Sequence, residues 1–172
     1  LKLGKSILRS KSLFPLAESR TKILIGGILL DQLRYSEAKT LYSMYLKEPK
    51  FSTSKVIRGN LGLAYLALGE ISLAEPLLLE NYNYRFDQHK SEASKVKSEN
   101  LSNSHANLLQ LYLQKKEYDE AEYHYAEALR LLLEVDSTGR LPRFAEIYFK
   151  KGKLEHALGK YDSSLAFLEK AM

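Results

Sequence analysis

Four segments of the chain repeat one pattern around a small residue. The small residues are Ala38, Ala74, Ala121 and Ser164. A large side chain stands three positions before each of them, at Tyr35, Ile71, Tyr118 and Tyr161. Self-similarity at intervals of 36, 47 and 43 residues predicts a stack of helix pairs, in which each unit buries its apolar face against its neighbours. A stack of this kind favours binding over catalysis.

Each unit is predicted to be a helix, a tight turn and a second helix. In the third unit, Leu108 and Tyr112 are spaced to share one face of the first helix. Tyr118 is placed in the turn, Asp119 is the predicted N-cap, and Glu122 completes a capping box. The same offset predicts N-caps in the other units, at Ser36, Ser72 and Asp162. The small residue that follows lets the two helix backbones approach closely at their crossing.

The segments Asn60–Tyr65 and Glu117–Glu122 resemble the tetratricopeptide repeat family. The resemblance covers residues 19–172. It implies an all-α, right-handed superhelical solenoid of antiparallel helix pairs with about four repeats. The predicted repeats are residues 19–54, 55–92, 93–140 and 141–172. Because the intervals exceed the usual 34 residues, the repeats are similar to the long-helix subclass of kinesin light chains and bacterial peptide-pheromone receptors.

The extra length is predicted to take two forms. Residues 83–101 lack Gly and Pro and indicate longer helices about a short polar turn, whereas residues 134–143 indicate a loop. In the fourth unit, Lys151 and Glu155 stand at offsets that are usually apolar. The first helix of that unit is therefore expected to be exposed, or covered by something beyond Met172.

The start of the chain departs from the repeats. Residues 1–18 are predicted to be a capping helix or the remnant of a preceding repeat, and the chain is read as a fragment of a larger protein. Residues 1–22 carry six basic side chains and one acid, while the remaining residues balance 20 of each. That distribution argues against nucleic acid, which needs a sustained basic stripe. The longest apolar run, 23–30, is too short to span a bilayer.

The sequence contains no recognisable catalytic constellation. There is no cysteine, so disulfides and thiolate metal sites are excluded. None of the histidines has a histidine four positions away, the spacing of a helical metal site. The prediction is therefore a protein that is not an enzyme and uses no cofactor or metal.

The family resemblance also implies a binding surface on the first helices of the units. Asparagine at the offset of Asn60 and Asn107 clamps the backbone of an extended peptide in the long-helix relatives, and an amide can both donate and accept as a peptide unit does. The alternative is that both asparagines solvate a helix face or bond a neighbouring helix. Further candidates are expected nearby on the same surface: Leu63, Gln110, Gln114, Lys150 and Lys153. At the other end, Ile23, Gly27 and Leu30 suggest an apolar contact.

The predicted function is a non-catalytic scaffold that binds proteins or peptides in the concave groove. The alternative is a ligand- or peptide-sensing regulatory domain of a larger signalling or transcription-regulating protein. The exposed end helices could also self-associate, and a cytoplasmic location is expected.

Overall fold

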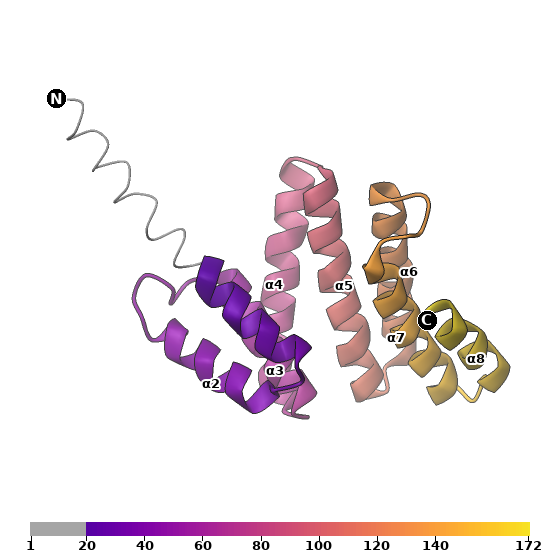
Figure 1. Ribbon diagram of the computed structural model, residues 1–172, viewed down its shortest axis with the longest axis horizontal. Helices are drawn as coiled ribbons and strands as arrows, with labels where there is room; N and C mark the ends of the chain where they lie inside the picture. Colours follow the sequence, from indigo (N-terminus) through magenta and orange to yellow (C-terminus); the bar gives the residue numbers. More distant parts are fainter. Residues whose placement is uncertain (1–19) are drawn as a thin grey trace. The chain divides into compact units, whose positions relative to one another are not determined.

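All regular secondary structure in the described residues is helical. The structure is a computed structural model that describes residues 20–172 (Figure 1). The predicted element at residues 1–18 lies outside that range. The helices are residues 20–31, α2 (Tyr35–Leu46), α3 (Lys55–Ala67), α4 (Ile71–Ser91), α5 (Lys95–Lys115), α6 (Tyr118–Val135), α7 (Pro142–Ala157) and α8 (Tyr161–Lys170). Residues 20–172 contain no strand, so the predicted all-α class is confirmed.

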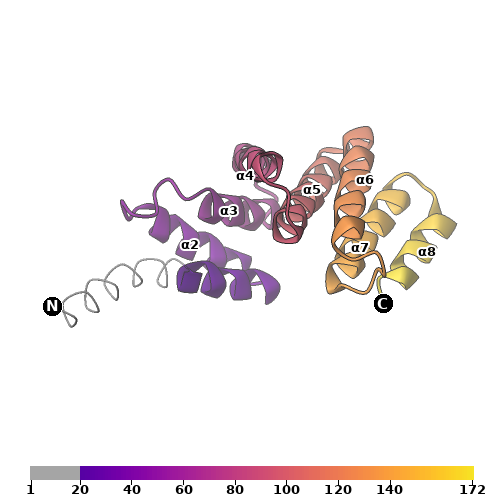
Figure 2. The same ribbon diagram turned by 90° about the horizontal axis from the view of Figure 1, so that it is seen from above.

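The described residues divide into two compact units, residues 20–70 and residues 71–172. The first unit contains the helix at 20–31 together with α2 and α3, and α2 packs against α3. The second unit contains α4 to α8, and each helix packs against the next along the chain. Figures 1 and 2 show these successive helices as antiparallel neighbours. In addition, α5 contacts α7, so the first helices of two successive pairs touch directly.

Tyr42 organises the first unit. Its side chain is fully buried, and its hydroxyl donates to the Ile23 carbonyl at 3.2 Å and accepts from the Asn60 amide at 2.9 Å. The ring lies where a Cβ on Gly26 would stand, only 2.2 Å from the nearest ring atom. Burial raises the pKa of Tyr42 to about 12, although the bond from Asn60 opposes the rise. One tyrosine therefore links three helices of this unit.

The turn inside every helix pair has the same geometry. The residue five positions before each small residue adopts a left-handed conformation, with φ of 60° at Leu33, 77° at Gly69, 62° at Lys116 and 75° at Gly159. The next amide then donates to the carbonyl five residues earlier, at 2.8 to 2.9 Å. This is the Schellman arrangement, which satisfies the last carbonyls of the first helix.

The predicted N-caps are wrong, and the turn geometry explains why. The Schellman turn leaves a single residue before the second helix, so α2, α6 and α8 begin at Tyr35, Tyr118 and Tyr161. The expected caps, Asp119 among them, are the second residue of each of these helices, two positions after the observed N-cap. The observed N-cap residues make no side-chain capping bond in these three helices. Acidic side chains in the first turn still favour the positive end of the helix dipole.

The four small residues are buried. Ala38, Ala74 and Ala121 have no exposed surface, and Ser164 is 4% exposed. In the second unit, Ala121 belongs to an apolar cluster of α5, α6 and α7 that includes Leu109, Tyr125 and Leu154. Ser164 differs from the alanines because its hydroxyl donates to the Gly152 carbonyl of α7 at 2.8 Å.

The first helix of the fourth pair is covered from within the chain. Lys151 and Glu155 are 5% and 4% exposed. The Lys151 ammonium pairs with Glu155 at 2.5 Å, also binds Glu122 of α6, and lies 4.9 Å from the centre of the Tyr125 ring. The expectation that these polar positions would be exposed or covered from outside the fragment is therefore wrong. The charges are buried because each has an opposite charge within reach.

The two long intervals are filled as expected. Residues 83–101 continue α4 to Ser91 and start α5 at Lys95, with a short turn between them. The second insertion is a loop between α6 and α7 that Asp136 organises. Its carboxylate accepts from the backbone amides of Thr138, Arg140 and Leu141 at 2.9 to 3.1 Å. The Thr138 hydroxyl and these amides lower the pKa of Asp136 to about 2.

Candidate functional site

Three of the predicted site residues share one face of α5. Asn107, Gln110 and Gln114 are spaced three and four apart, which places them above one another on a helix. All three are half-buried. Among residues 20–172, their amide groups have no hydrogen-bonding partner in the protein. They are therefore able to donate and accept toward a ligand.

Two predicted lysines lie on α7, which contacts α5. Lys150 donates to Glu146 at 2.6 Å and its side chain is only 13% exposed. Lys153 is exposed, and its ammonium lies 4.9 Å from the centre of the Phe149 ring. It makes no ion pair with any of the described residues. Lys153 is thus the lysine of this pair that is free to meet an acidic group.

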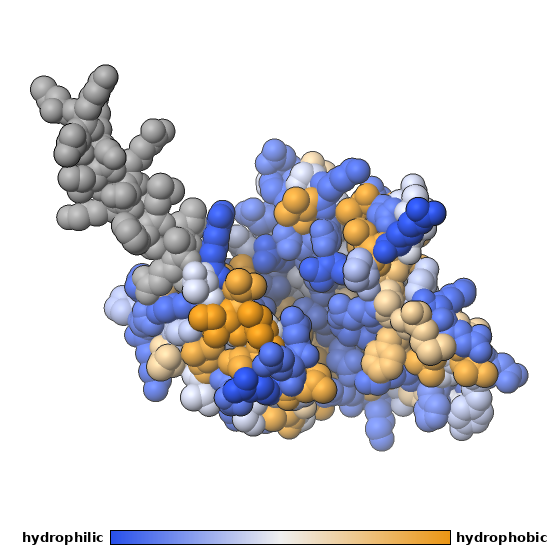
Figure 3. Space-filling model, viewed as in Figure 1, coloured by the Kyte–Doolittle hydropathy of each residue, from blue (hydrophilic) through white to orange (hydrophobic). Residues whose placement is uncertain are grey.

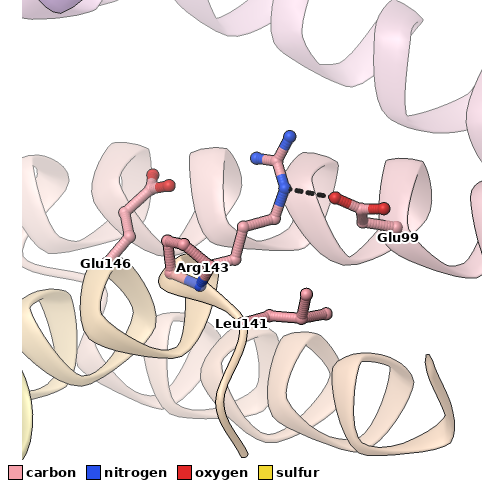
Figure 4. Close-up of a pocket in the computed structure, with 5 residues that line it drawn as sticks. Glu99, Leu141, Arg143 and Glu146 are labelled. Carbon is pink, nitrogen blue, oxygen red and sulfur yellow. Dashed lines mark hydrogen bonds and ion pairs between the residues drawn. The ribbon is translucent and has the colours of Figure 1, made fainter. Parts of the chain in front are cut away.

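A hollow opens near the start of α7, where that helix meets α5. It has a volume of about 410 Å³ and is lined by Glu99, Leu141, Pro142, Arg143 and Glu146. Figure 4 shows the Arg143 side chain between the two glutamates, with its Nε bonded to Glu99 at 2.6 Å. Sequence reasoning missed this contact because it joins residues of two different repeats.

Asn60 and Leu63 lie on α3, in the first unit. The Asn60 amide donates to the buried Tyr42 hydroxyl at 2.9 Å. This is the alternative in which asparagine bonds a neighbouring helix, and it gives Asn60 a role inside the protein. Leu63 is half-buried. The structure therefore brings the α5 and α7 candidates onto touching helices, while these two belong to a separate unit.

An apolar surface lies over the helix at residues 20–31. Leu24, Ile25 and Ile28 are 64%, 44% and 45% exposed. Figure 3 shows hydrophobic surface over this helix, whereas the surface seen over α5 is mostly hydrophilic. The residues that the sequence suggested for an apolar contact, Ile23, Gly27 and Leu30, are half-buried. The exposed face of this helix therefore consists of their neighbours.

The interior of the second unit holds a histidine pair that sequence spacing did not reveal. The Nδ1 atoms of His105 and His124 are 2.8 Å apart, and both side chains are buried. Tyr112 stacks on His124 with ring centres 5.3 Å apart, and Tyr82 meets His105 edge-on at 5.0 Å. Burial lowers the pKa of both histidines to about 4, so both are neutral near pH 7.

The histidine pair does not extend into a larger ligand set. The described residues bring together no group of three histidine, cysteine, aspartate or glutamate side chains that could hold a metal ion. Among residues 20–172, no helix has both the length and the apolar composition needed to cross a bilayer. The surface of α5 and α7 therefore presents carboxamide groups that can form hydrogen bonds and one lysine that can bind an acidic group.

Comparison with known proteins finds a family similarity in part of the second unit. The profile of the family described as Tetratricopeptide repeat matches residues 102–131 and residues 145–172. The two matches support a tetratricopeptide repeat family for this chain. They fall on α5–α6 and α7–α8, and with the helical structure they confirm a helical-repeat fold. Tetratricopeptide repeats generally mediate protein–protein interaction and typically form non-catalytic scaffolds. No curated protein matched the sequence.

Proposed function

We propose that the second unit binds an extended peptide segment of a partner protein on the face shared by α5 and α7. The observation that carries this proposal is the half-buried Asn107 amide, which has no partner among the described residues and stands on a helix in direct contact with α7. An amide free to donate and accept matches the peptide unit. Lys153 adds a positive charge on the adjoining helix.

The proposed relationship is to the long-repeat subclass, similar to kinesin light chains and bacterial peptide-pheromone receptors. Two features support it. The helices α4 and α5 each have 21 residues, and the small residues of the last three pairs are 47 and 43 positions apart. Longer helices lengthen the face that a repeat offers to an extended ligand, because a helix rises about 1.5 Å for each residue.

Selection from a display library of random linear peptides tests the proposal. The full 172-residue chain is immobilised, the selected peptides are synthesised with a fluorophore, and their Kd is measured by polarisation. The double variant Asn107→Ala, Gln110→Ala is expected to weaken binding by about tenfold or more, since two hydrogen-bonding groups are removed.

Asn83→Ala is the matched control, because Asn83 is an exposed asparagine on α4. It is expected to bind like the wild type. A library that yields no peptide for the wild-type chain would overturn the proposed function. Selected peptides that bind the double variant as tightly as the wild type would remove this face as the binding site.

A further inference from the structure

An aromatic cluster joins α4 and α6 across the buried histidine pair, and the proposed peptide site does not use it. Tyr82 of α4 meets His105 and His124 edge-on, with ring centres 5.0 and 6.0 Å apart. Tyr123 of α6 meets the same two rings, also edge-on, at 6.2 and 5.1 Å. Phe86 extends the cluster along α4, with its ring centre 6.0 Å from that of Tyr82. The second helices of two successive pairs therefore hold one connected set of rings.

The outer rings of this cluster are open to solvent. Tyr123 is 53% exposed and Phe86 is 44% exposed, whereas both histidines are buried. Tyr82 is half-buried. Among residues 20–172, the rings of Tyr82 and Tyr123 make no contact with each other. Because both contact the same histidines, the two tyrosines flank the pair without stacking. We call Tyr82, Tyr123, His105 and His124 the aromatic cage.

A carboxylate lies beside the two tyrosines of the aromatic cage. Glu127 follows Tyr123 by four positions on α6, so the two side chains share a face of that helix. Burial raises the pKa of Tyr82, and the nearby Tyr123 and Glu127 raise it further, so these three side chains converge. The hydrogen bond from Arg130 holds the pKa of Glu127 below its usual range. Glu127 is therefore ionised near pH 7.

The charges beside the aromatic cage leave a negative excess. Arg130 pairs with Glu127 at 2.9 Å and with Glu134 at 2.5 Å, so two carboxylates share one guanidinium. Glu120 stands seven positions before Glu127 on the same face of α6, and it forms no ion pair within residues 20–172. A cation brought to this face therefore meets negative charge that the described protein does not neutralise.

Neither the histidines nor Arg85 opposes a cation in the aromatic cage. Burial lowers the pKa of His105 and His124 to about 4, so the pair is uncharged near pH 7. The Arg85 guanidinium lies over the ring of Tyr84, 5.4 Å from the ring centre. Tyr84 is two positions from Tyr82, and residues two apart do not face each other on a helix. The guanidinium is therefore directed away from the cage.

Elsewhere in the chain, a ring beside a carboxylate holds a lysine. Four lysines each lie over a tyrosine ring and pair with a glutamate, namely Lys22, Lys39, Lys115 and Lys151. The Lys39 ammonium, for example, is 5.6 Å from the centre of the Tyr65 ring and 2.7 Å from Glu70. In the part of the chain that the structure describes, no lysine or arginine lies over the rings of Tyr82 and Tyr123. The aromatic cage therefore offers ring and carboxylate together to a cation from another molecule.

We propose that the aromatic cage binds the ammonium group of a lysine side chain from a partner protein. The ammonium lies between the rings of Tyr82 and Tyr123, and the four-carbon stem packs on Phe86, as lysine stems do on apolar surfaces. A small free ammonium compound would leave the exposed Phe86 ring unused, which favours lysine. This goes beyond the proposed function, because it assigns a second binding surface on other helices and a ligand of positive charge.

Binding of short peptides to the full 172-residue chain tests this inference. The first peptide has one lysine flanked by glycines, and the matched peptide has norleucine, which keeps an apolar stem but lacks the ammonium. The NMR shifts of the His105 and His124 ring protons follow the binding. The lysine peptide is expected to bind with a Kd of about 1 mM, and loss of the ammonium to weaken binding about tenfold.

Variants of Tyr123 separate the effect of the ring from that of the rest of the side chain. Tyr123→Leu removes the ring and is expected to weaken binding of the lysine peptide about fivefold, whereas Tyr123→Phe keeps the ring and should bind like the wild type. Because Tyr123 is exposed, both variants should fold, which circular dichroism checks. Tyr161→Leu is the matched control, since Tyr161 is an exposed tyrosine of α8 and its loss should leave binding unchanged.

Three results would overturn the inference. Equal binding of the lysine and norleucine peptides, or no binding of either, would show that the cluster is not a cation site. Tyr123→Leu binding as tightly as the wild type would place the lysine elsewhere. Tighter binding of choline than of the lysine peptide would assign the aromatic cage to a free ammonium compound instead of a partner's lysine. The library selection for the proposed function is not used here, so either can fail while the other stands.

Discussion

The helix pairs α5–α6 and α7–α8 match the same family profile, yet they bury different chemistry at equivalent positions. Leu108 and Tyr112 of α5 correspond to Lys151 and Glu155 of α7, 43 positions later. Leu108 is 1% exposed and Lys151 is 5% exposed, so both are interior residues. The fold therefore accepts either an apolar side chain or a paired charge at this position, provided that the charge is neutralised.

One residue at the contact of the two helices also differs between the pairs. α5 has Leu109 where α7 has Gly152. A Cβ on Gly152 would lie 2.9 Å from Leu168 of α8, so the absence of a side chain lets the two helices meet there. The α5–α6 pair is bridged by neutral polar groups, namely the histidine pair and the bond from the Ser102 hydroxyl to the Ala128 carbonyl. The Ser164 hydroxyl bridges α7 and α8, and α7 itself buries the ion pair of Lys151 and Glu155. One buries neutral polar groups and the other buries charges.

Acid is expected to cause the largest loss of stability, and it acts on the histidine pair between α5 and α6. The folded pKa of His105 and His124 is about 4, below the ordinary value of 6.5. The unfolded chain therefore binds more protons than the folded chain between pH 6.5 and 4. The contribution of the two neutral histidines to the free energy of unfolding is fully present above that window and is lost as the pH falls through it. The loss reaches about 3 kcal/mol for each histidine below pH 4.

The charged surroundings of the pair modify this effect. Glu127 favours the protonated histidines and Arg130 opposes protonation of His105, but burial is the largest influence on both. Urea unfolding between pH 7 and pH 5 measures the slope of the free energy of unfolding against pH. The double variant His105→Leu, His124→Leu removes both partners together and should flatten it. An equal slope in wild type and double variant would show that other groups cause the acid sensitivity.

The second-largest loss of stability is expected from removal of one of the buried charges of α7. Lys151→Leu leaves Glu155 buried without its partner and is expected to lower the free energy of unfolding by about 3–5 kcal/mol. Although burial alone raises the pKa of Glu155, the bond and charge of Lys151 bring it below its ordinary value. Removal of Lys151 therefore takes away the strongest of the interactions that lower the pKa of Glu155, while the Ser163 hydrogen bond and the charge of Lys160 remain.

Transfer of the α5 residues completes this test. Lys151→Leu combined with Glu155→Tyr places the side chains of Leu108 and Tyr112 in α7 and should recover most of the lost stability, because no isolated charge remains. Thermal unfolding of the single and double variants at pH 7 provides the measurement. A double variant as unstable as the single one would show that the two interiors are not interchangeable.

The repeated apolar and small residues were sufficient to predict the helices but not the pairing of polar residues. The all-α class, the long helices over 83–101 and the loop after α6 follow from periodicity and from Gly and Pro, which act locally. The helix that carries Lys151 was predicted to be exposed or covered from beyond Met172, and spacing along one helix does not reveal the partner Glu122, which lies on α6, 29 residues away. The helix starts were missed by two residues because the left-handed turn residue acts through φ, and only Gly69 and Gly159 mark it.

In the candidate site, too, the sequence predicted the position of residues on helices but not the contacts between polar side chains. Asn107 could be placed on a helix face from its offset, and α5 carries it there. Asn60, at the same offset, is bonded to Tyr42, because the side chain that stands opposite differs between repeats. His105 and His124 meet across two helices, a contact that spacing along one helix cannot show. What the sequence predicts least well is which polar side chains meet.

A smaller effect is expected where the two pairs share their architecture, at the small residue of the crossing. Ala121→Leu should overpack α6 against α5 and lower stability by about 1–3 kcal/mol. Ala126→Leu is the matched control, since Ala126 is an exposed alanine of the same helix, and its change should stay within about 0.5 kcal/mol. Equal urea midpoints for the two variants would contradict a tight crossing at Ala121.

The smallest effect concerns the turn, where the two pairs differ by one residue. Lys116 and Gly159 adopt the same left-handed conformation, with φ of 62° and 75°. A side chain makes this conformation unfavourable by about 1 kcal/mol, whereas glycine adopts it freely. Lys116→Gly should therefore stabilise the second unit slightly, and Gly159→Lys should destabilise it by a similar amount. Opposite shifts in the thermal midpoint are expected because the two turns share one geometry; shifts of the same sign would mean that the Lys116 side chain itself stabilises its turn.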